Sequence, residues 1–368
     1  MKRNPALDIL RCVAIFLVLG WHLPVPEPSP LVRDLVWPWR GFGWAGVDLF
    51  FVLSGFLVGG LLMAEQMKSG KINLGRFYER RAFKIWPAYY VMIGIFLLNR
   101  IRRHDSIVPL VGNLLNVQNY TGTYIRVTWS LAVEEHFYLL LGVTLVLLAK
   151  RNAISVRSMA WVYAASVVIS LGSRIVMVAT RQDPVSISWF TNCRLDSLCL
   201  GVLLAACYHF GSPAWAWLAR QRALLVGVIL LSASAQINAQ YSAFMLTFGL
   251  WSVALGSAAV LLLLFTAEPE TPLGRVIRSR IGATLAWIGE RSYGIYLWHT
   301  SSSPVVLWVY RRVLPHSEYA AYAFAVATWI SAAILLGFLS HRLVELPFLK
   351  LRERLKPRVA TALETEAS

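Results

Sequence analysis

The sequence has few charged residues, and acidic ones are especially scarce. Only 15% of its 368 residues are charged and 57% are hydrophobic, which is too apolar for a soluble enzyme of this size. Acidic residues number 19, against 35 Lys and Arg. No long polar segment separates the apolar ones. We therefore predict an integral membrane domain over residues 1–349, followed by a basic and then acidic cytoplasmic tail over residues 350–368.

Cysteine is also scarce, and its pattern excludes two kinds of site. The four cysteines form no paired CxxC and no cysteine-rich loop, so neither a disulfide framework nor a zinc site is supported. We expect no bound metal and no permanently bound cofactor. The net charge of +16 does not indicate nucleic acid, because the basic residues lie in short loops beside apolar spans, where topology and anionic lipid explain them.

Long apolar segments dominate what is present. A hydrocarbon core of about 30 Å needs about 20 apolar residues to cross it, and about ten such segments can be drawn. They lie near residues 7–23, 44–64, 82–99, 128–149, 158–179, 188–209, 223–239, 243–265, 285–310 and 320–343. This pattern predicts an all-α, polytopic membrane helix bundle. The first segment lacks a small-x-small cleavage site after His22, so we expect it to be retained.

Basic residues indicate the orientation of the bundle. Lys and Arg cluster between Lys68 and Lys84 and again in the tail, and such clusters favour the cytoplasmic side. Arg100, Arg102, Arg103 and Arg126 lie on the opposite side and weaken the contrast. We predict that both termini are cytoplasmic and that the protein is a multi-pass protein of the inner (plasma) membrane.

Arg11 and His22 share the first apolar segment. Eleven helical residues return to within about 20° of the starting direction, so both side chains lie on one face, about 16 Å apart. Asp8 lies three residues before Arg11 and is placed to pair with it. Ionisable residues inside a membrane usually mark a site or a pathway. The alternative, in which Arg11 snorkels and His22 caps the helix, remains open.

Asp48 in the second segment is the predicted partner of His22. A carboxylate that accepts one ring N–H fixes the imidazole tautomer and makes the other nitrogen a better base. The alternative is that Asp48 only caps its helix. Ser54 and Gly55 in the same segment predict close approach of a neighbouring helix.

The segment that begins near Trp129 places Ser130, Glu134 and Tyr138 at successive i+4 positions. Glu135 and His136 lie alongside. Adjacent carboxylates entering an apolar helix are difficult to explain by packing, so we predict that this face binds substrate and that Glu134 takes part in catalysis.

Two further segments carry polar groups. Arg194 and Asp196 lie close together in the sixth segment, and Tyr293, Tyr296 and His299 follow helical spacing in the ninth. We predict that Arg194 and His299 line the substrate site. The alternatives are an internal ion pair for the sixth segment and an interfacial position for His299.

Arg80, Arg81 and Lys84 precede the third apolar run, with Arg81 and Lys84 on one helix face. Such cations bind phosphate through charge-assisted hydrogen bonds. A positive-inside anchor is the equally open alternative.

Six features in this order resemble the acyltransferase-3 family of integral membrane acyltransferases, which includes enzymes that O-acetylate surface polysaccharides. They are Asp8, Arg11 and His22 in the first segment and the strings VDLFFVLSGFL (47–57), RRAFKIWPAYY (80–90), WSLAVEEHFYL (129–139), RLDSLCLG (194–201) and SYGIYLWH (292–299). The resemblance covers about residues 7–348.

The resemblance implies a cytoplasmic acyl-CoA donor and an acceptor hydroxyl on a lipid-linked or growing glycan. The family's pattern of a basic residue, ten intervening residues and a histidine falls on Arg11 and His22, and its two-arginine CoA motif falls on Arg81 and Lys84. Lysine at the second position lacks the bidentate fork of arginine. His136 stands where related sequences commonly have Gln. No fused hydrolase-like domain follows the last segment, so we expect an acceptor that the membrane domain itself can hold.

We therefore expect a membrane O-acyltransferase that moves an acyl group, acetyl being the family's commonest, from acyl-CoA to a saccharide or glycolipid hydroxyl. The predicted catalytic residues are His22, Asp48 and Glu134. Arg11, Arg81 and Lys84 are expected to bind the donor, and the expected substrate-binding residues are Ser130, Glu135, Tyr138, Arg194 and His299. Two alternatives are a proton-coupled carrier and a noncatalytic scaffold held by interhelical hydrogen bonds.

Overall fold

The computed structural model describes residues 4–355, and every regular element within that range is a helix. The predicted all-α class is confirmed. The α-helices are α1 Pro5–Trp21, α2 Pro30–Gly41, α3 Gly46–Ser69, α4 Leu74–Arg102, α5 Val111–Leu114, α6 Gln118–Thr121, α7 Trp129–Lys150, α8 Val156–Ala179, α9 Pro184–Trp189, α10 Leu195–His209, α11 Pro213–Arg220, α12 Arg222–Ala235, α13 Leu250–Phe265, α14 Pro272–Arg278, α15 Arg280–Glu290, α16 Ser292–Trp298, α17 Ser303–Val313, α18 Glu318–Ser340 and α19 Leu346–Leu355.

Six helical stretches of the described chain are long and apolar enough to cross a membrane, judged by length and composition. A seventh is added if α10 and α11, bent by 103° at the break between them, form one broken span. The stretches are Pro30–Ser69, Leu74–Arg102, Arg126–Lys150, Val156–Ala179, Met245–Phe265 and Glu318–Leu355. The predicted number of ten is therefore not confirmed.

The expected span over residues 285–310 is not one helix. It is divided among α15, α16, the short 3-10 helix His299–Ser302 and α17. The Ser302 hydroxyl donates to the His299 carbonyl at 2.7 Å. Local side-chain bonds of this kind compete with regular helical pairing, so this apolar stretch bends where its polar residues lie.

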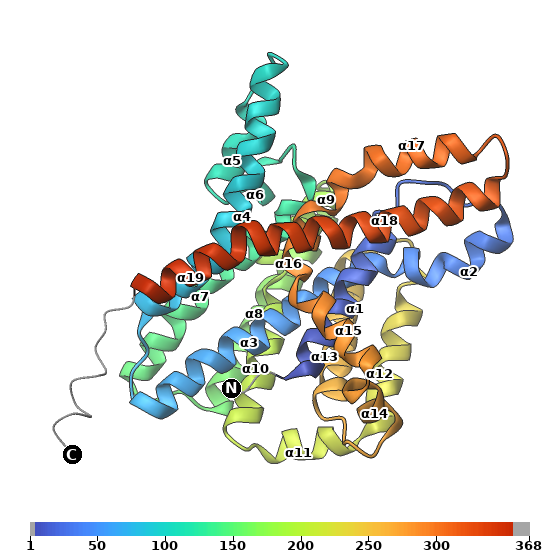
Figure 1. Cartoon of the computed structure of the whole chain (residues 1–368). Coiled ribbons are helices and arrows are strands. Elements are labelled where there is room, and N and C mark those ends of the chain that lie inside the picture. The colour runs from blue at the N-terminus through green and yellow to red at the C-terminus, as the bar shows by residue number, and fades with distance from the viewer. Residues whose placement is uncertain (1–3, 356–368) are drawn as a thin grey trace, which may run out of the picture.

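Helix α1 lies at the centre of the bundle and packs against α2, α3, α13, α15 and α16 (Figure 1). The contact with α15 is close, because a Cβ placed at Gly289 would lie 1.7 Å from the Asp8 carbonyl oxygen. Leu19 accepts a hydrogen bond from the buried indole of Trp329 in α18 at 2.8 Å. Arg11 and His22 therefore extend from a helix that is fixed along its length.

Helices α3 and α10 are packed together at two glycines. A Cβ at Gly55 would lie 1.9 Å from the Leu198 carbonyl oxygen, and one at Gly201 would lie 2.1 Å from that of Val52. The predicted close approach at Gly55 is confirmed. No other residue fits here without separation of the two backbones.

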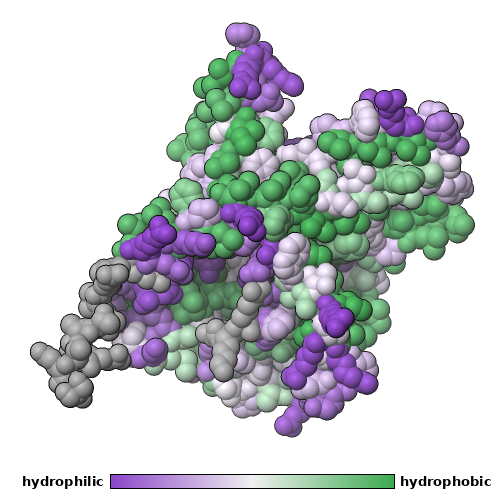
Figure 2. Space-filling model, in the orientation of Figure 1, coloured by the Kyte–Doolittle hydropathy of each residue, from purple (hydrophilic) through white to green (hydrophobic). Residues whose placement is uncertain are grey.

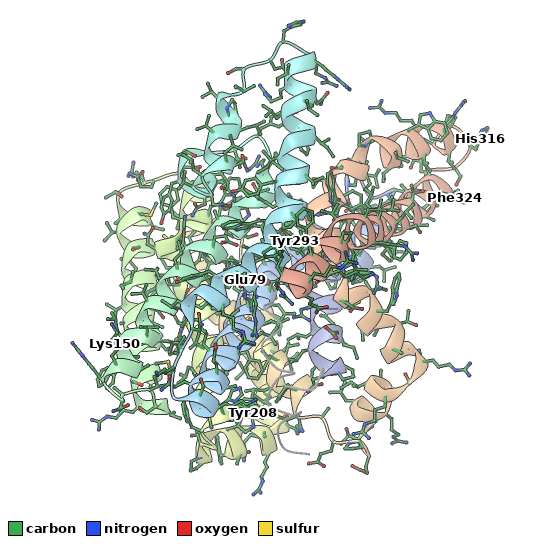
Figure 3. The ribbon with its side chains drawn as sticks, turned by 60° about the vertical axis from the view of Figure 1, so that its left-hand side comes forward. Glu79, Lys150, Tyr208, Tyr293, His316 and Phe324 are labelled. Atoms are coloured by element: carbon green, nitrogen blue, oxygen red, sulfur yellow. The ribbon has the colours of Figure 1, made fainter. Side chains whose placement is uncertain are left out.

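The bundle has two ends, which the labelled side chains in Figure 3 help to locate: Lys150 and Tyr208 lie toward one end and His316 toward the other. We call the end where α1 begins the inner end and the end where it finishes the outer end, following the predicted topology.

Hydrophobic residues cover much of the two protruding parts of the surface in Figure 2. The predicted tail is described only to Leu355, within α19; residues 356–368 lie outside the described part.

Candidate active site

Helix α1 contributes to two cavities. The inner cavity has a volume of about 150 Å³ and is lined by Arg11. The outer cavity has a volume of about 930 Å³ and is lined by His22. Val47 and Tyr296 line both. Arg11 lies within α1 and His22 is the residue that caps its C-terminal end, so the helix and its cap give each cavity one ionisable side chain.

The inner cavity brings together most of the predicted donor and substrate residues. Its wall includes the cations Arg11, Arg81 and Lys84, and it also includes Ser130, Glu134 and Tyr138, the i+4 series of α7. Six of the predicted site residues therefore meet in one cavity.

A hydrogen-bonded chain crosses this cavity. The Ser54 hydroxyl lies 2.8 Å from the Tyr138 hydroxyl, which in turn donates to the Glu134 carboxylate at 2.9 Å. The Arg81 guanidinium lies 5.2 Å from the centre of the Tyr138 ring. The phenol therefore holds both a carboxylate and a cation in place, and Ser54 extends the site onto α3.

Two of the cations have acidic partners. Arg11 pairs with Asp8 at 2.5 Å, as the three-residue spacing predicted. Lys84 pairs with Glu345 at 2.8 Å, and His341 lies 3.3 Å from the same carboxylate oxygen. From the sequence alone, Glu345 was given no part in the site. Its spacing of four residues from His341 was the available signal, because residues four apart share a helix face.

Tyr296 forms the boundary between the cavities. Its hydroxyl lies 2.6 Å from that of Ser130 and donates to the Val127 carbonyl at 2.9 Å. Since the tyrosine proton goes to Val127, Ser130 is the donor to Tyr296. These bonds fix the ring across the junction, in a position that sequence spacing alone did not reveal.

His22 opens into the outer cavity with one ring nitrogen occupied. Its Nδ1 lies 3.0 Å from the Val18 carbonyl oxygen, which makes Nδ1 the protonated nitrogen. Within residues 4–355, no side chain or backbone group is hydrogen-bonded to Nε2. The ring is therefore oriented with a lone pair available to a substrate.

The prediction that Asp48 orients His22 is wrong. Asp48 is fully buried, pairs with Arg194 at 2.7 Å and accepts a hydrogen bond from the Ser197 hydroxyl at 3.0 Å. A buried carboxylate needs a counter-charge, and the residue before α10 supplies it. Arg174 in turn pairs with Asp196 at 2.6 Å. The alternative of an ion pair within the sixth segment is therefore also wrong, because both of its charged residues pair with residues of other helices.

His299 packs against His22 and does not line either cavity. The two ring centres lie 4.9 Å apart in an edge-to-face arrangement. His299 is fully buried, and its Nδ1 lies 2.7 Å from the Tyr296 carbonyl oxygen. It therefore packs behind the His22 ring, and its predicted place in the wall of the substrate site is wrong, because it lines neither cavity.

Glu135 also lies away from both cavities. One of its carboxylate oxygens accepts a hydrogen bond from the Trp86 indole at 3.5 Å, while the other is buried without a partner. A rotation of about 100° separates neighbouring helical side chains, which directs Glu135 toward α4 when Glu134 faces the inner cavity. The predicted substrate role of Glu135 has no support in this arrangement, whereas Arg194 does line the outer cavity.

Comparison with known proteins identifies the family. A model of the acyltransferase-3 family, described as an acyltransferase domain, matches residues 4–340. The chain belongs to the acyltransferase-3 family. No solved structure matches the chain. The matched range includes Arg11 and His22, which line the inner and the outer cavity respectively.

Several curated proteins are similar to this acyltransferase-3 chain. Peptidoglycan O-acetyltransferase OatA of Listeria monocytogenes is 26% identical over 95% of the chain and 56% of its own length. A putative O-acetyltransferase of Staphylococcus aureus is 28% identical over 95% of the chain and 58% of its own length. O-acetyltransferase OatA of Staphylococcus aureus is 25% identical over 94% and 57%. The chain thus spans a little over half the length of these relatives.

Proposed function

We propose that this protein is a membrane O-acyltransferase that moves an acyl group, acetyl in the first instance, from acyl-CoA at the inner end to a saccharide hydroxyl at the outer end. We place it in the plasma membrane with both termini in the cytoplasm. The observation that carries the proposal is the single helix that exposes Arg11 to one cavity and His22 to another, with Tyr296 between them.

The inner cavity is assigned to the donor. Three cations line it, and cations bind CoA phosphate oxygens through charge-assisted hydrogen bonds. A volume of about 150 Å³ suits the thioester arm rather than the whole of CoA. In this arrangement, Arg81 and Lys84 hold the phosphates near the inner mouth while the acyl group points toward Tyr296.

The outer cavity is assigned to the acceptor. The acceptor hydroxyl gives its proton to His22 Nε2, its oxygen attacks the thioester carbonyl, the C–S bond breaks and the CoA sulfur leaves with the electron pair. The Val18 carbonyl keeps the His22 proton on Nδ1, so Nε2 is ready to accept. In an alternative two-step route, His22 Nε2 attacks the thioester carbonyl and takes the acyl group as the C–S bond breaks and CoA leaves. The acceptor hydroxyl then takes the acyl group from His22.

Release of CoA from acetyl-CoA tests this function. The purified full chain in detergent is incubated with a crude glycolipid extract as acceptor, and free thiol is measured for the wild type, His22→Ala and the matched control His316→Ala. His316 is exposed in the loop before α18, so its loss should have no effect, whereas His22→Ala should lower release about 100-fold or more.

Absence of both CoA release and acetyl-CoA binding in the wild type would contradict the proposal and favour the carrier alternative. A separate titration tests the donor site: Arg81→Ala should weaken acetyl-CoA binding about tenfold, and Arg157→Ala, at an exposed position of the inner end, should not. Equal affinities for these two variants would remove Arg81 from the donor site.

A further inference from the structure

The charged side chains that line the outer cavity are all basic. Two guanidinium groups, those of Arg126 and Arg194, line it, and no carboxylate does. Arg194 is neutralised by Asp48. Arg126 takes part in no ion pair within residues 4–355. The cavity that His22 lines therefore carries one positive charge that no ion pair among residues 4–355 neutralises.

Arg126 is nevertheless held in position. Its guanidinium lies 5.4 Å from the centre of the Trp189 ring, and Trp189 stacks on Trp129 at 5.9 Å with 4° between the ring planes. Arg194 lies 5.7 Å from the Trp129 ring on its own side. A cation over an aromatic face keeps its N–H groups free to donate, and no described residue accepts a hydrogen bond from the Arg126 side chain.

The remaining wall suits a sugar. Nine of its residues are aromatic, and hydroxyl and amide groups alternate with them. Aromatic rings offer flat apolar faces for the C–H face of a pyranose, and the amides and hydroxyls can exchange hydrogen bonds with its hydroxyl groups. The polar members are Asn99, Ser188, Gln240, Thr300 and Ser301.

We propose that the outer cavity selects an anionic saccharide, whose carboxylate or phosphate binds Arg126 while a hydroxyl of the same molecule reaches His22. The inference rests on the proposed function, because that function assigns this cavity to the acceptor. Arginine recognises both anions through the same planar pair of N–H donors, so the chemistry on the protein side is shared.

Binding of matched soluble sugars tests the inference. The full chain in phosphatidylcholine nanodiscs, which add no net lipid charge, is titrated with trigalacturonic acid and with its methyl ester. A second pair, N-acetylglucosamine 1-phosphate and N-acetylglucosamine, distinguishes phosphate from carboxylate. Tryptophan fluorescence reports binding, because Trp129 and Trp189 line the cavity.

We expect at least one anionic sugar to bind about tenfold more tightly than its neutral counterpart in 0.1 M salt and to lose most of that preference in 1 M salt. Arg126→Gln should abolish the preference and Arg126→Lys should keep part of it. Arg312→Gln is the matched control: Arg312 also lies over an indole ring, that of Trp308 at 5.5 Å, but does not line this cavity.

Absence of any charge preference in both pairs, including failure of all four sugars to bind, overturns the inference. A preference that survives in Arg126→Gln overturns it as well. The proposed function is judged separately. His22-dependent CoA release, combined with sugar binding that does not depend on charge, would contradict the inference and leave the proposed function in place. Charge-selective binding without CoA release would support the selectivity of the cavity and contradict the proposed function.

Discussion

Loss of the Asp48 carboxylate should lower the stability of the helix bundle rather than act directly on the reaction. Asp48 is fully buried and Arg194 is only 3% exposed, so Asp48→Ala leaves a buried cation without its counter-charge. Removal of one partner from such a pair costs about 3–5 kcal/mol. Arg194 borders the outer cavity, where water can solvate it in part, so we expect the lower end, about 3 kcal/mol.

The assay is thermal unfolding of the detergent-solubilised protein. The fraction that remains monodisperse on size-exclusion chromatography is measured after heating to each temperature. A loss of about 3 kcal/mol should lower the midpoint by roughly 4 °C, because an unfolding entropy of about 2 cal/mol/K per residue amounts to about 0.8 kcal/mol/K for 368 residues. The double variant Asp48→Leu with Arg194→Met removes both charges and should recover most of the loss, because apolar replacement of a buried pair is often neutral. His22→Ala should leave the midpoint near that of the wild type.

The refuting result is specific. If Asp48→Ala keeps the wild-type unfolding midpoint but loses CoA release as fully as His22→Ala does, Asp48 acts on the chemistry, as was predicted from the sequence. That result would also mean that the ion pair with Arg194 contributes little to the fold.

Three further predictions concern the packing and the two cavities. Glu345→Gln removes the charge that pairs with Lys84, so acetyl-CoA should bind about threefold more tightly in a titration; weaker binding would show that Glu345 positions the lysine. Gly55→Ala should lower the unfolding midpoint, whereas Gly94→Ala, whose Cβ would meet nothing within 4 Å, should not; similar midpoints would contradict the close packing of α3 on α10. Tyr296→Phe removes the hydroxyl bonds at the junction and should raise acceptor-independent hydrolysis of acetyl-CoA several-fold; an unchanged ratio of hydrolysis to transfer would exclude Tyr296 as a barrier.

Local periodicity made part of the site predictable. Arg11 and His22 were placed by a helical repeat within one segment, and Ser130, Glu134 and Tyr138 by another. Each of these side chains does line one of the two cavities. Residues of one helix keep their relative directions whatever the tertiary structure, so spacing was sufficient.

Partners on different helices were not predictable in the same way. Asp48 could face α1 or α10, and nothing in its own segment distinguishes the two. The choice depends on Arg194, which lies 146 residues later in the sequence, and on the glycines that bring α3 and α10 together. The break within residues 285–310 was missed for a related reason, because hydropathy measures composition and does not register where polar side chains redirect the backbone.

The separation of Arg11 from His22 has a consequence for the reaction. A donor and an acceptor on opposite sides of a bilayer can react only if an acyl group reaches a basic nitrogen without admitting water to the thioester. Tyr296 lines both cavities, and its hydroxyl is hydrogen-bonded to the Ser130 hydroxyl and the Val127 carbonyl, so its ring is fixed where the two cavities meet. The ion pairs of Asp48 and Asp196 hold the surrounding helices, while the His22 Nε2 lone pair has no partner in the described protein. The buried charges thus stabilise the frame, and the basic nitrogen is left for the substrate.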